Sequence, residues 1–312
     1  LEADRARLLE ARGRRVRPAR DDKVIASWNG LMISALARGA RILDDAALAT
    51  RAAGAAEFVW TALRADVGDA DAPLALARRW RDGEAAGAGQ LADYAACALG
   101  CLDLYEAAFD PLWLERASRL ADALVRRFFD AEHGGFFESP AGADSLRVRL
   151  KDGFDGAEIA GNSLAAEAAQ RLGSLLDRRE WLEAAGRTFG YYGARLAGGA
   201  YAMPRMLAAM DLATGPPRHV VVAGRPEAED TRALVREFRR RYLPRDLLLL
   251  SDGGERSRRL ATLAPFAATL APAGGRATAY VCVDYACRLP VTDVNEFAAQ
   301  LDEMEKTRPE ER

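Results

Sequence analysis

Apolar positions recur at helical spacing from residue 27 to about residue 212, in segments separated by short polar turns. The stretches "LATRAAGAAEFVW", "WLERASRLADALVRRFF" and "WLEAAGRTFGYYGARL" share one pattern, whose matching alanines stand 65 and 68 residues apart. An Ala/Leu-rich segment and a turn with an aspartate precede each stretch, as in "LDDA", "AFDP" and "LLDRR". The repeat predicts a helical hairpin that occurs about three times. Its first helices are expected at residues 30–43, 92–108 and 162–176.

The segments between these hairpins are long and carry aromatic residues and glycines. Two helices and a turn fill only about half of the repeat, so a tightly stacked solenoid is disfavoured. Alternating positions in "GGFFES" and "SLRVRLK" predict β-hairpins in these connections. Helix pairs joined by long loops at one end are typical of a closed ring whose loops surround a mouth. The expected fold is mainly α, a partial (α/α)6 toroid with β-hairpin loops.

The pattern changes at Pro216. "HVVVAG", a charged amphipathic segment and "DLLLL" predict a β-α-β unit, followed by a strand in "ATAYVCV" and a helix from about Asp293. The glycine-rich loops that bind dinucleotides or phosphates are absent. We therefore expect toroid hairpins over 1–215, a small α/β appendage over 216–304 and a solvated tail over 305–312.

Composition narrows the classes of partner. Of the 312 residues, 44 are Lys or Arg and 46 are Asp or Glu, a net charge of −2 that favours neither nucleic acid nor an anionic membrane. The apolar runs are far shorter than the ~20 residues that span a bilayer. Four cysteines make no disulfide framework and fit a reducing compartment, so we expect a cytoplasmic protein. "LEADRARLLEARGRR" starts without Met and is typical of the end of a longer helix, which predicts a preceding segment.

Six ordered motifs resemble one known family over nearly the whole chain. They are "RPARDDKVIASWNGLMISALA", "LADYA", "LWLERASRLAD", "DAEHGGFFES", "RLKDGFDGAEIAGNSLAA" and "ATAYVCVDYACRLPV". Together they resemble the C-terminal part of the spermatogenesis-associated thioredoxin-like family. The resemblance implies a thioredoxin-like domain followed by a toroid similar to six-hairpin glycosidases and N-acylglucosamine 2-epimerases. It also implies that the thioredoxin-like domain, a partner in cis, and the early hairpins precede this sequence.

Polar clusters open each predicted hairpin at the repeat spacing, where the ring gathers its loops. An indole face stacks on a sugar ring while carboxylates and amides hold its hydroxyl groups, so the mouth is expected to bind a sugar-like small molecule. The expected substrate-binding residues are Asp21, Trp28, Asn29, Tyr94, Lys151, Asp152 and Asn162. Glycosidic cleavage needs two carboxyl groups, one protonated and one ionised. The candidate acids and bases are Asp22, Asp93, Asp155 and Glu158.

Each of these residues also has a structural interpretation. Asp93 and Asn162 are suited to cap helices, and Asp22 could pair with Lys23 or an arginine. Lys151 could pair with the adjacent Asp152, and Trp28 could belong to the core. Trp113 and Trp181, which recur inside the repeat, are expected to pack.

Other chemistry is less favoured by the residues. Epimerases of similar fold use histidines on inner helices as bases, whereas His133 lies in a turn and His219 opens a strand. The arginines of residues 12–20 form a solvated run or hold an anionic sugar near the mouth. Cys282 and Cys287 match neither a C-x-x-C motif nor a zinc site, which leaves a buried strand cysteine or thiol exchange with the thioredoxin-like domain. No metal and no cofactor is predicted.

Two functions therefore stand side by side. The first is a carbohydrate-active domain with possible glycosidase-like or epimerase-like chemistry. The alternative is a non-catalytic toroid that regulates or scaffolds the thioredoxin-like domain.

Overall fold

The computed structural model describes residues 1–65, 74–142 and 147–306, and most of them lie in helices. The helices are α1 (Glu2–Gly13), α2 (Ala26–Leu43), α3 (Ala46–Ala62), α4 (Leu91–Ala108), α5 (Pro111–Phe128), α6 (Gly161–Leu175), α7 (Arg179–Gly199), α8 (Pro204–Leu212), α9 (Glu229–Arg239), α10 (Glu255–Leu263), α11 (Pro265–Ala268) and α12 (Val294–Lys306), with a 3₁₀ turn η1 (Ala200–Ala202). The strands are β1 (Val24–Ile25), β2 (Arg64–Ala65), β3 (Ala75–Arg81), β4 (Glu84–Ala88), β5 (Arg218–Ala223), β6 (Asp246–Ser251), β7 (Thr278–Val283) and β8 (Ala286–Cys287).

The three predicted helical hairpins are present as α2/α3, α4/α5 and α6/α7. In each turn one residue adopts a left-handed conformation, namely Asp44, Phe109 and Asp177. Asp45 and Asp110 then accept hydrogen bonds from backbone N–H groups two residues ahead and start the next helix. The aspartates of the repeated turns therefore reverse the chain.

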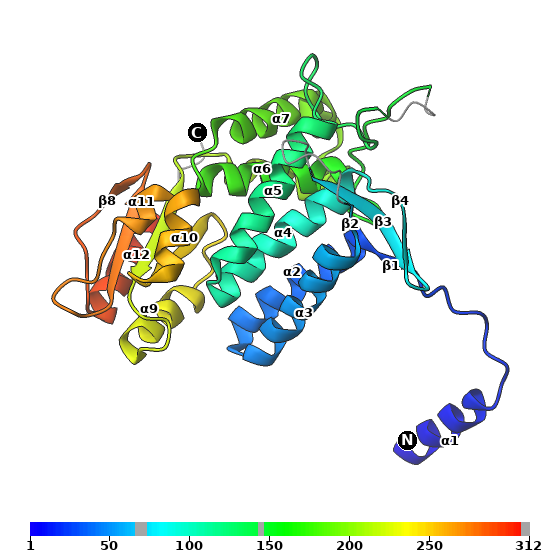
Figure 1. The fold of residues 1–312 in the computed structure, drawn as a ribbon, viewed down its shortest axis with the longest axis horizontal. Helices are drawn as coiled ribbons and strands as arrows, with labels where there is room; N and C mark the ends of the chain where they lie inside the picture. Colours follow the sequence, from blue (N-terminus) through cyan, green and yellow to red (C-terminus); the bar gives the residue numbers. More distant parts are fainter. Residues whose placement is uncertain (66–73, 143–146, 307–312) are drawn as a thin grey trace.

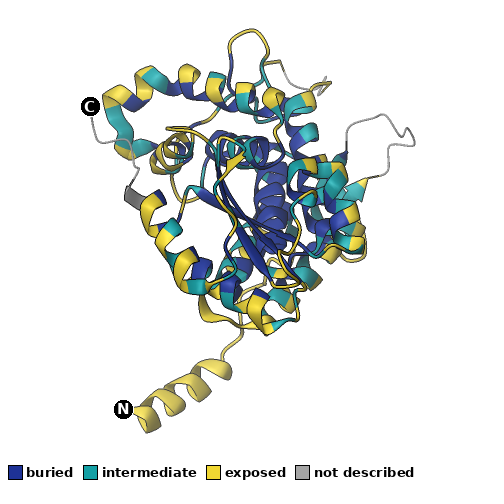
Figure 2. Cartoon of the chain, turned by 90° about the vertical axis from the view of Figure 1, so that its left-hand side faces the viewer, coloured by how far each residue is buried: buried dark blue, intermediate teal, exposed yellow. Residues whose placement is uncertain are grey.

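The hairpins pack as two layers of an arc (Figure 1). Helices α2, α4, α6 and α8 lie side by side as the inner layer, and each outer helix packs on its own partner and on the next inner helix. The central helix α4 is buried over almost its whole length, as Figure 2 shows for the middle of the molecule. This arrangement confirms the mainly α fold and the architecture of a partial toroid.

Close approach of α2 and α4 depends on two glycines. A Cβ atom at Gly30 would lie 2.5 Å from the backbone carbon of Ala96, and one at Gly100 would lie 2.7 Å from the carbonyl oxygen of Gly30. Each glycine thus meets the backbone of the opposite helix. The Ala and Gly content of the repeat reflects this packing.

The loops between hairpins partly depart from the prediction. A β-hairpin forms from β3 and β4, with β1 and β2 also paired to β3. The predicted hairpin of "GGFFES" and "SLRVRLK" is wrong for the described residues, where an isolated bridge joins Phe129 to Phe136. Side chains take the place of a ladder: Asn162 bonds both the N–H and the C=O of Phe136, and Arg149 donates to the carbonyl of Ser139.

The C-terminal part forms the predicted β-α-β unit. Its sheet has the order β6-β5-β7-β8, with β5 and β6 parallel and the other pairs antiparallel. The unit packs on the arc: Tyr285 Oη donates to the carbonyl of Ser174, and Arg259 pairs with Glu115 at 2.8 Å. Helix α1 projects from the other end and buries none of its residues (Figure 1). Of the predicted tail, residues 307–312 lie outside the described residues.

Candidate functional site

The predicted site residues lie around the starts of the inner helices. Trp28 and Asn29 stand in the first turn of α2, Asp93 and Tyr94 in that of α4, and Asn162 in that of α6. The 151–160 loop connects to the start of α8. We call this end of the arc the mouth and define it by Trp28, Glu138, Asp152, Phe154 and Glu158.

Asp93 fastens the start of α2 to the start of α4. Its fully buried carboxylate accepts the N–H of Ser27 at 2.9 Å and that of Gln90 at 2.8 Å, and Arg78 lies 3.3 Å away. Burial raises the pKa of Asp93, while these hydrogen bonds and Arg78 oppose the shift. The carboxylate is thus part of a capping box, as the structural interpretation predicts.

Tyr94 and Asn162 also hold backbone. The Tyr94 hydroxyl accepts the N–H of Leu76 at 2.8 Å, and its ring packs against Phe128. Asn162 is fully buried, and its amide donates to the carbonyls of Phe136 and Asp152 instead of capping α6. Neither side chain is open to a ligand.

Asp155 closes the loop that precedes α6. Its two carboxylate oxygens accept the N–H of Ala160 at 3.0 Å and the N–H of Arg205 at 2.8 Å. The second bond places a negative charge at the start of α8, where the helix dipole favours it. Asp155 therefore ties the loop to that helix.

The remaining polar residues of the prediction lie beside these. Asn29 donates to the carbonyl of Ile25 at 2.9 Å, which secures the first turn of α2. Asp22 pairs with Arg81 at 2.8 Å, as the structural interpretation predicts. Exposed Asp21 pairs with Lys23, which lowers the pKa of Asp21.

The expected Lys151 to Asp152 pair is wrong. The Lys151 ammonium is buried, lies 2.7 Å from Asp130 and donates to the carbonyl of Gly134 at 2.6 Å. It also stands over the rings of Phe137 and Tyr191. Lys151 thus holds the loop together and leaves Asp152 exposed at the mouth.

Trp28 and Glu158 present polar and aromatic groups to solvent. The indole is 56% exposed, and its N–H donates to Glu158 at 3.1 Å. Trp28 is therefore outside the core. Next to this pair along the loop, exposed Asp152, Phe154 and Tyr201 line a cavity of about 410 Å³.

Glu138 is a carboxyl group at the mouth that the sequence analysis missed. One carboxylate oxygen lies 3.4 Å from the N–H of Asp152 and 3.4 Å from the amide of Asn162. Burial and the charge of Asp152 raise the pKa of Glu138 to about 7. A carboxyl group that is half protonated near neutrality can act as a general acid.

Replacing Glu138 with glutamine should remove a pH-dependent part of the stability. Because the pKa of Glu138 is higher in the folded state than in the unfolded state, protonation of this group favours folding. This contribution to stability is complete below the pKa of the unfolded state and is lost as the pH rises through about 7. Between about pH 5 and about pH 8, E138Q should therefore gain about 2 kcal/mol relative to wild type. Urea unfolding at several pH values measures this change. Glu132→Gln in the neighbouring exposed loop is the control, and a pH-independent difference for E138Q would contradict the assignment.

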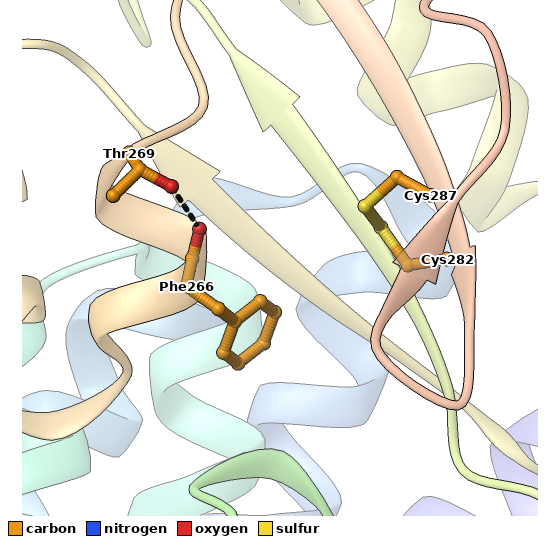
Figure 3. Close-up of a disulfide and its surroundings, with 4 residues drawn as sticks. All are labelled: Phe266, Thr269, Cys282 and Cys287. Carbon is orange, nitrogen blue, oxygen red and sulfur yellow. Dashed lines mark hydrogen bonds between the residues drawn. A yellow bond between two sulfur atoms is a disulfide. The ribbon is translucent and has the colours of Figure 1, made fainter.

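Cys282 and Cys287 form a disulfide across the β7/β8 hairpin (Figure 3). The expectation of free cysteines at these two positions is wrong, because the turn sets the two residues directly opposite each other. Cys282 is buried and Cys287 is exposed. The two free cysteines, Cys97 and Cys101, are buried between helices, and burial raises the pKa of both thiols.

The two histidines lie away from the inner helices. His133 is exposed in the loop after α5, and His219 is buried in β5, where its ring packs against those of Phe266 and Tyr285. Burial lowers the pKa of His219 to about 4. Neither is placed as a base at the mouth.

Residues 1–65, 74–142 and 147–306 contain neither a cluster of metal ligands nor a membrane-spanning helix. There, no group of three or more His, Cys, Asp or Glu side chains is placed to hold a metal ion. Among the same residues, no helix combines the length and apolar character needed to cross a bilayer.

Distant solved structures cover about half of the chain. An inactive variant of the GH76A α-1,6-mannanase of Salegentibacter sp. HEL1_6, in complex with α-1,6-mannotriose, is 16% identical. The matched region covers 54% of this chain and 46% of the mannanase chain, with a TM-score of 0.43. The cellobiose 2-epimerase of Spirochaeta thermophila is 19% identical. The matched region covers 55% of this chain and 43% of the epimerase chain, and the TM-score is again 0.43. These likenesses carry no conclusion about function.

Sequence relatives are closer. No family model matches the chain. Spermatogenesis-associated protein 20 of Homo sapiens is 35% identical over 297 residues, and that of Mus musculus is 34% identical over the same length. Each match covers 92% of this chain and 37% of the relative, so the chain spans little more than a third of the length of these relatives. The chain is a homologue of spermatogenesis-associated protein 20.

Proposed function

We propose that the mouth binds a saccharide or sugar derivative and that Glu138 supplies the acid. The observation that carries this proposal is a carboxyl group with a pKa of about 7 in a loop region with exposed aromatic rings. Solvated carboxylates are usually charged at neutral pH, so a protonatable one in such a place favours proton donation.

The aromatic rings supply stacking surfaces. Trp28, Phe154 and Tyr201 are 56%, 61% and 89% exposed, although large apolar side chains are usually covered in a folded protein. Phe154 and Tyr201 line the same cavity as Asp152. A pyranose ring can stack on such faces while carboxylates accept its hydroxyl groups.

The carboxyl groups of the mouth divide into two sets. Asp93 and Asp155 accept backbone N–H groups, and Asp22 pairs with an arginine, so these three support the fold in our proposal. Glu138 and Asp152 each accept a backbone N–H with one oxygen, and Glu158 accepts the indole N–H of Trp28 with one oxygen. In our proposal the second oxygen of each of these three carboxyl groups serves the ligand. In glycosidic chemistry Glu138 would donate its proton to the leaving oxygen, and Asp152 or Glu158 would act as the ionised partner.

Ligand-detected NMR tests the proposal directly. Neutral sugars, sugar acids and sugar phosphates are screened against the protein and against Trp28→Ala and Glu138→Gln. We expect each substitution to lower the affinity for a detected ligand about tenfold or more, because Trp28→Ala removes a stacking face and Glu138→Gln removes a hydrogen bond. Trp28→Phe and Glu132→Gln are the matched controls. Equal binding by wild type, W28A and E138Q would contradict the proposal.

Silence across the whole panel with folded variants would instead favour the alternative of a non-catalytic scaffold. In that case the partner to test is a thioredoxin-like domain, which the sequence resemblance suggests in cis. Full-length relatives with and without the mouth substitutions would then be compared for the activity of that domain.

Thiol exchange is a second proposed function, favoured by the Cys282–Cys287 disulfide and its exposed half. A thiolate of a dithiol protein would attack Sγ of Cys287, break the disulfide and leave Cys282 as a thiolate that takes up a proton. The second thiol of the partner would then displace Cys287, so the partner becomes oxidised and both cysteines become thiols.

Alkylation after mild reduction with a small dithiol checks this function. Cys287 should be labelled first, whereas Cys97 and Cys101 should stay unlabelled because they are buried. Mass spectrometry of the folded protein locates the label. Absence of labelling at both Cys282 and Cys287 in folded, reduced protein would end this proposal.

A further inference from the structure

An arginine-rich cavity of about 680 Å³ lies between the inner helices and the C-terminal unit. Its charged lining residues are Arg38, Arg41, Glu106, Glu167, Arg171, Arg205, Asp211, Arg239, Arg240, Arg241 and Asp246. Arg41 follows Trp28 by 13 residues on α2, which is about 20 Å along a helix. The cavity therefore lies well away from Trp28 along α2. It reaches the start of α8 through Arg205, whose backbone N–H donates to Asp155.

Three carboxylates in and beneath this cavity are shared by the arginines around them. Asp103 lies 2.7 Å from Arg38 and 2.8 Å from Arg171. Glu106 lies 2.6 Å from Arg41 and 3.1 Å from Arg171.

Glu167 completes the network. It lies 2.5 Å from Arg205, 3.6 Å from Arg38 and 3.7 Å from Arg171. The network thus contains three carboxylates and four arginines, Arg38, Arg41, Arg171 and Arg205.

Arg239 enters the same network from α9 without a carboxylate of its own among the described contacts. It donates to the carbonyls of Glu106 and Ala107 and stands over the ring of Phe109. Burial and the nearby charge of Arg41 lower the pKa of Arg239 to about 10. The charge of Asp44 also acts on Arg239 and opposes this shift. With Asp44 counted, five guanidinium groups face four carboxylates, an excess of one positive charge.

The guanidinium groups also have more donors than the protein satisfies. Among the described residues, Arg171 Nη1, Arg205 Nε and Arg239 Nε are buried without a hydrogen-bond acceptor. Arg240 and Arg241 on the rim pair with Glu237, and Arg241 also pairs with Asp302, so these two arginines face two carboxylates and add no net charge. Buried donors without acceptors cost free energy, and an anion whose oxygens accept these N–H groups would recover part of that cost.

We propose that this cavity binds a small anion with phosphate or carboxylate oxygens, such as a phosphate ester or a dicarboxylate. The excess of positive charge favours an anion, and the planar fork of arginine suits phosphate and carboxylate oxygens. The volume is enough for a small metabolite. Because the lining comes from the arc and from α9, the ligand would also join the two parts of the molecule.

Thermal unfolding and calorimetry with inorganic phosphate, malonate and chloride at equal ionic strength test this site. Phosphate, malonate or both should raise the melting temperature and bind saturably, whereas chloride should not. Phosphate alone would identify a phosphate-type ligand, and malonate alone a dicarboxylate. Arg205→Gln and Arg239→Gln should each weaken binding about tenfold.

Arg232→Gln, an exposed position on the same helix as Arg239, is the matched control and should bind like wild type. Two arginine variants are used so that a folding defect in one leaves the other informative, and circular dichroism confirms folding. The site is rejected if the three salts act alike on wild type, or if R205Q and R239Q both bind as wild type does.

Discussion

Arg171→Met is expected to lower the free energy of unfolding by about 3–5 kcal/mol, since it leaves buried carboxylates without their shared partner. The Arg171 guanidinium contacts Asp103 at 2.8 Å and Glu106 at 3.1 Å, and both acids are buried. Burial alone would lower the pKa of Arg171 and raise that of Asp103, but the ion pairs reverse both shifts. The charges of Asp103 and Glu106 raise the pKa of Arg171, and the charges of Arg171 and Arg38 hold the pKa of Asp103 well below its usual range. Urea unfolding at neutral pH measures the loss.

Two companion variants make the result specific. Arg171→Lys keeps the charge but offers one ammonium in place of a fork, so it should lose less than Arg171→Met but still be destabilised. Arg179→Met, on the exposed first turn of α7, should change stability by no more than about 0.5 kcal/mol. A loss for R171M as small as that of R179M would show that the network is not needed for folding.

Gly30→Ala is the second substitution with a large expected effect. The new methyl group would lie 2.5 Å from the backbone carbon of Ala96 and 2.6 Å from the N of Cys97, so α2 and α4 would have to separate. We expect a loss of about 3 kcal/mol, the upper part of the range for overpacked cores. Thermal and urea unfolding of the same variant measure it.

Gly186→Ala is the matched control for this prediction. Gly186 also lies inside a helix, but a Cβ atom there would have no neighbour within 4 Å. Alanine is the better helix former, so this variant should gain about 0.5–1 kcal/mol. If both variants changed stability in the same direction, the close approach of α2 and α4 would be wrong.

The helical hairpins could be predicted because their signals are local. Asp45 and Asp110 cap helices that begin one residue later, and the apolar spacing around Ala117 and Ala185 marks faces that become buried. The β-α-β unit was likewise readable from its own apolar runs. Such elements depend on residues that are close in sequence.

The contacts of the mouth depend on residues far apart in sequence. Asp93 accepts a hydrogen bond from Ser27, 66 residues earlier, and Glu158 accepts one from Trp28, 130 residues earlier. Glu138 lies in "GGFFES", whose alternation suggested a strand, and its raised pKa results from burial and from Asp152. Composition and spacing give no measure of that burial.

One signal in the sequence could have found the arginine network. Arg38 pairs with Asp103, 65 residues on, and Arg171 pairs with Asp103 from 68 residues beyond it. These intervals equal those of the hairpin repeat. Opposite charges separated by one repeat interval therefore indicate ion pairs between neighbouring inner helices.

A carbon-13 NMR titration of the Glu138 carboxyl group decides whether this group can serve as the acid of a sugar site. Selectively labelled protein is titrated alone and with the saccharide that binds best in the ligand screen, and Glu138→Gln assigns the signal. The account predicts a midpoint near pH 7, as the pKa of about 7 requires, and a shift of that midpoint when the saccharide binds. A midpoint near that of a solvent-exposed glutamate, unchanged by every saccharide, would contradict a role for Glu138 as the acid of a sugar site.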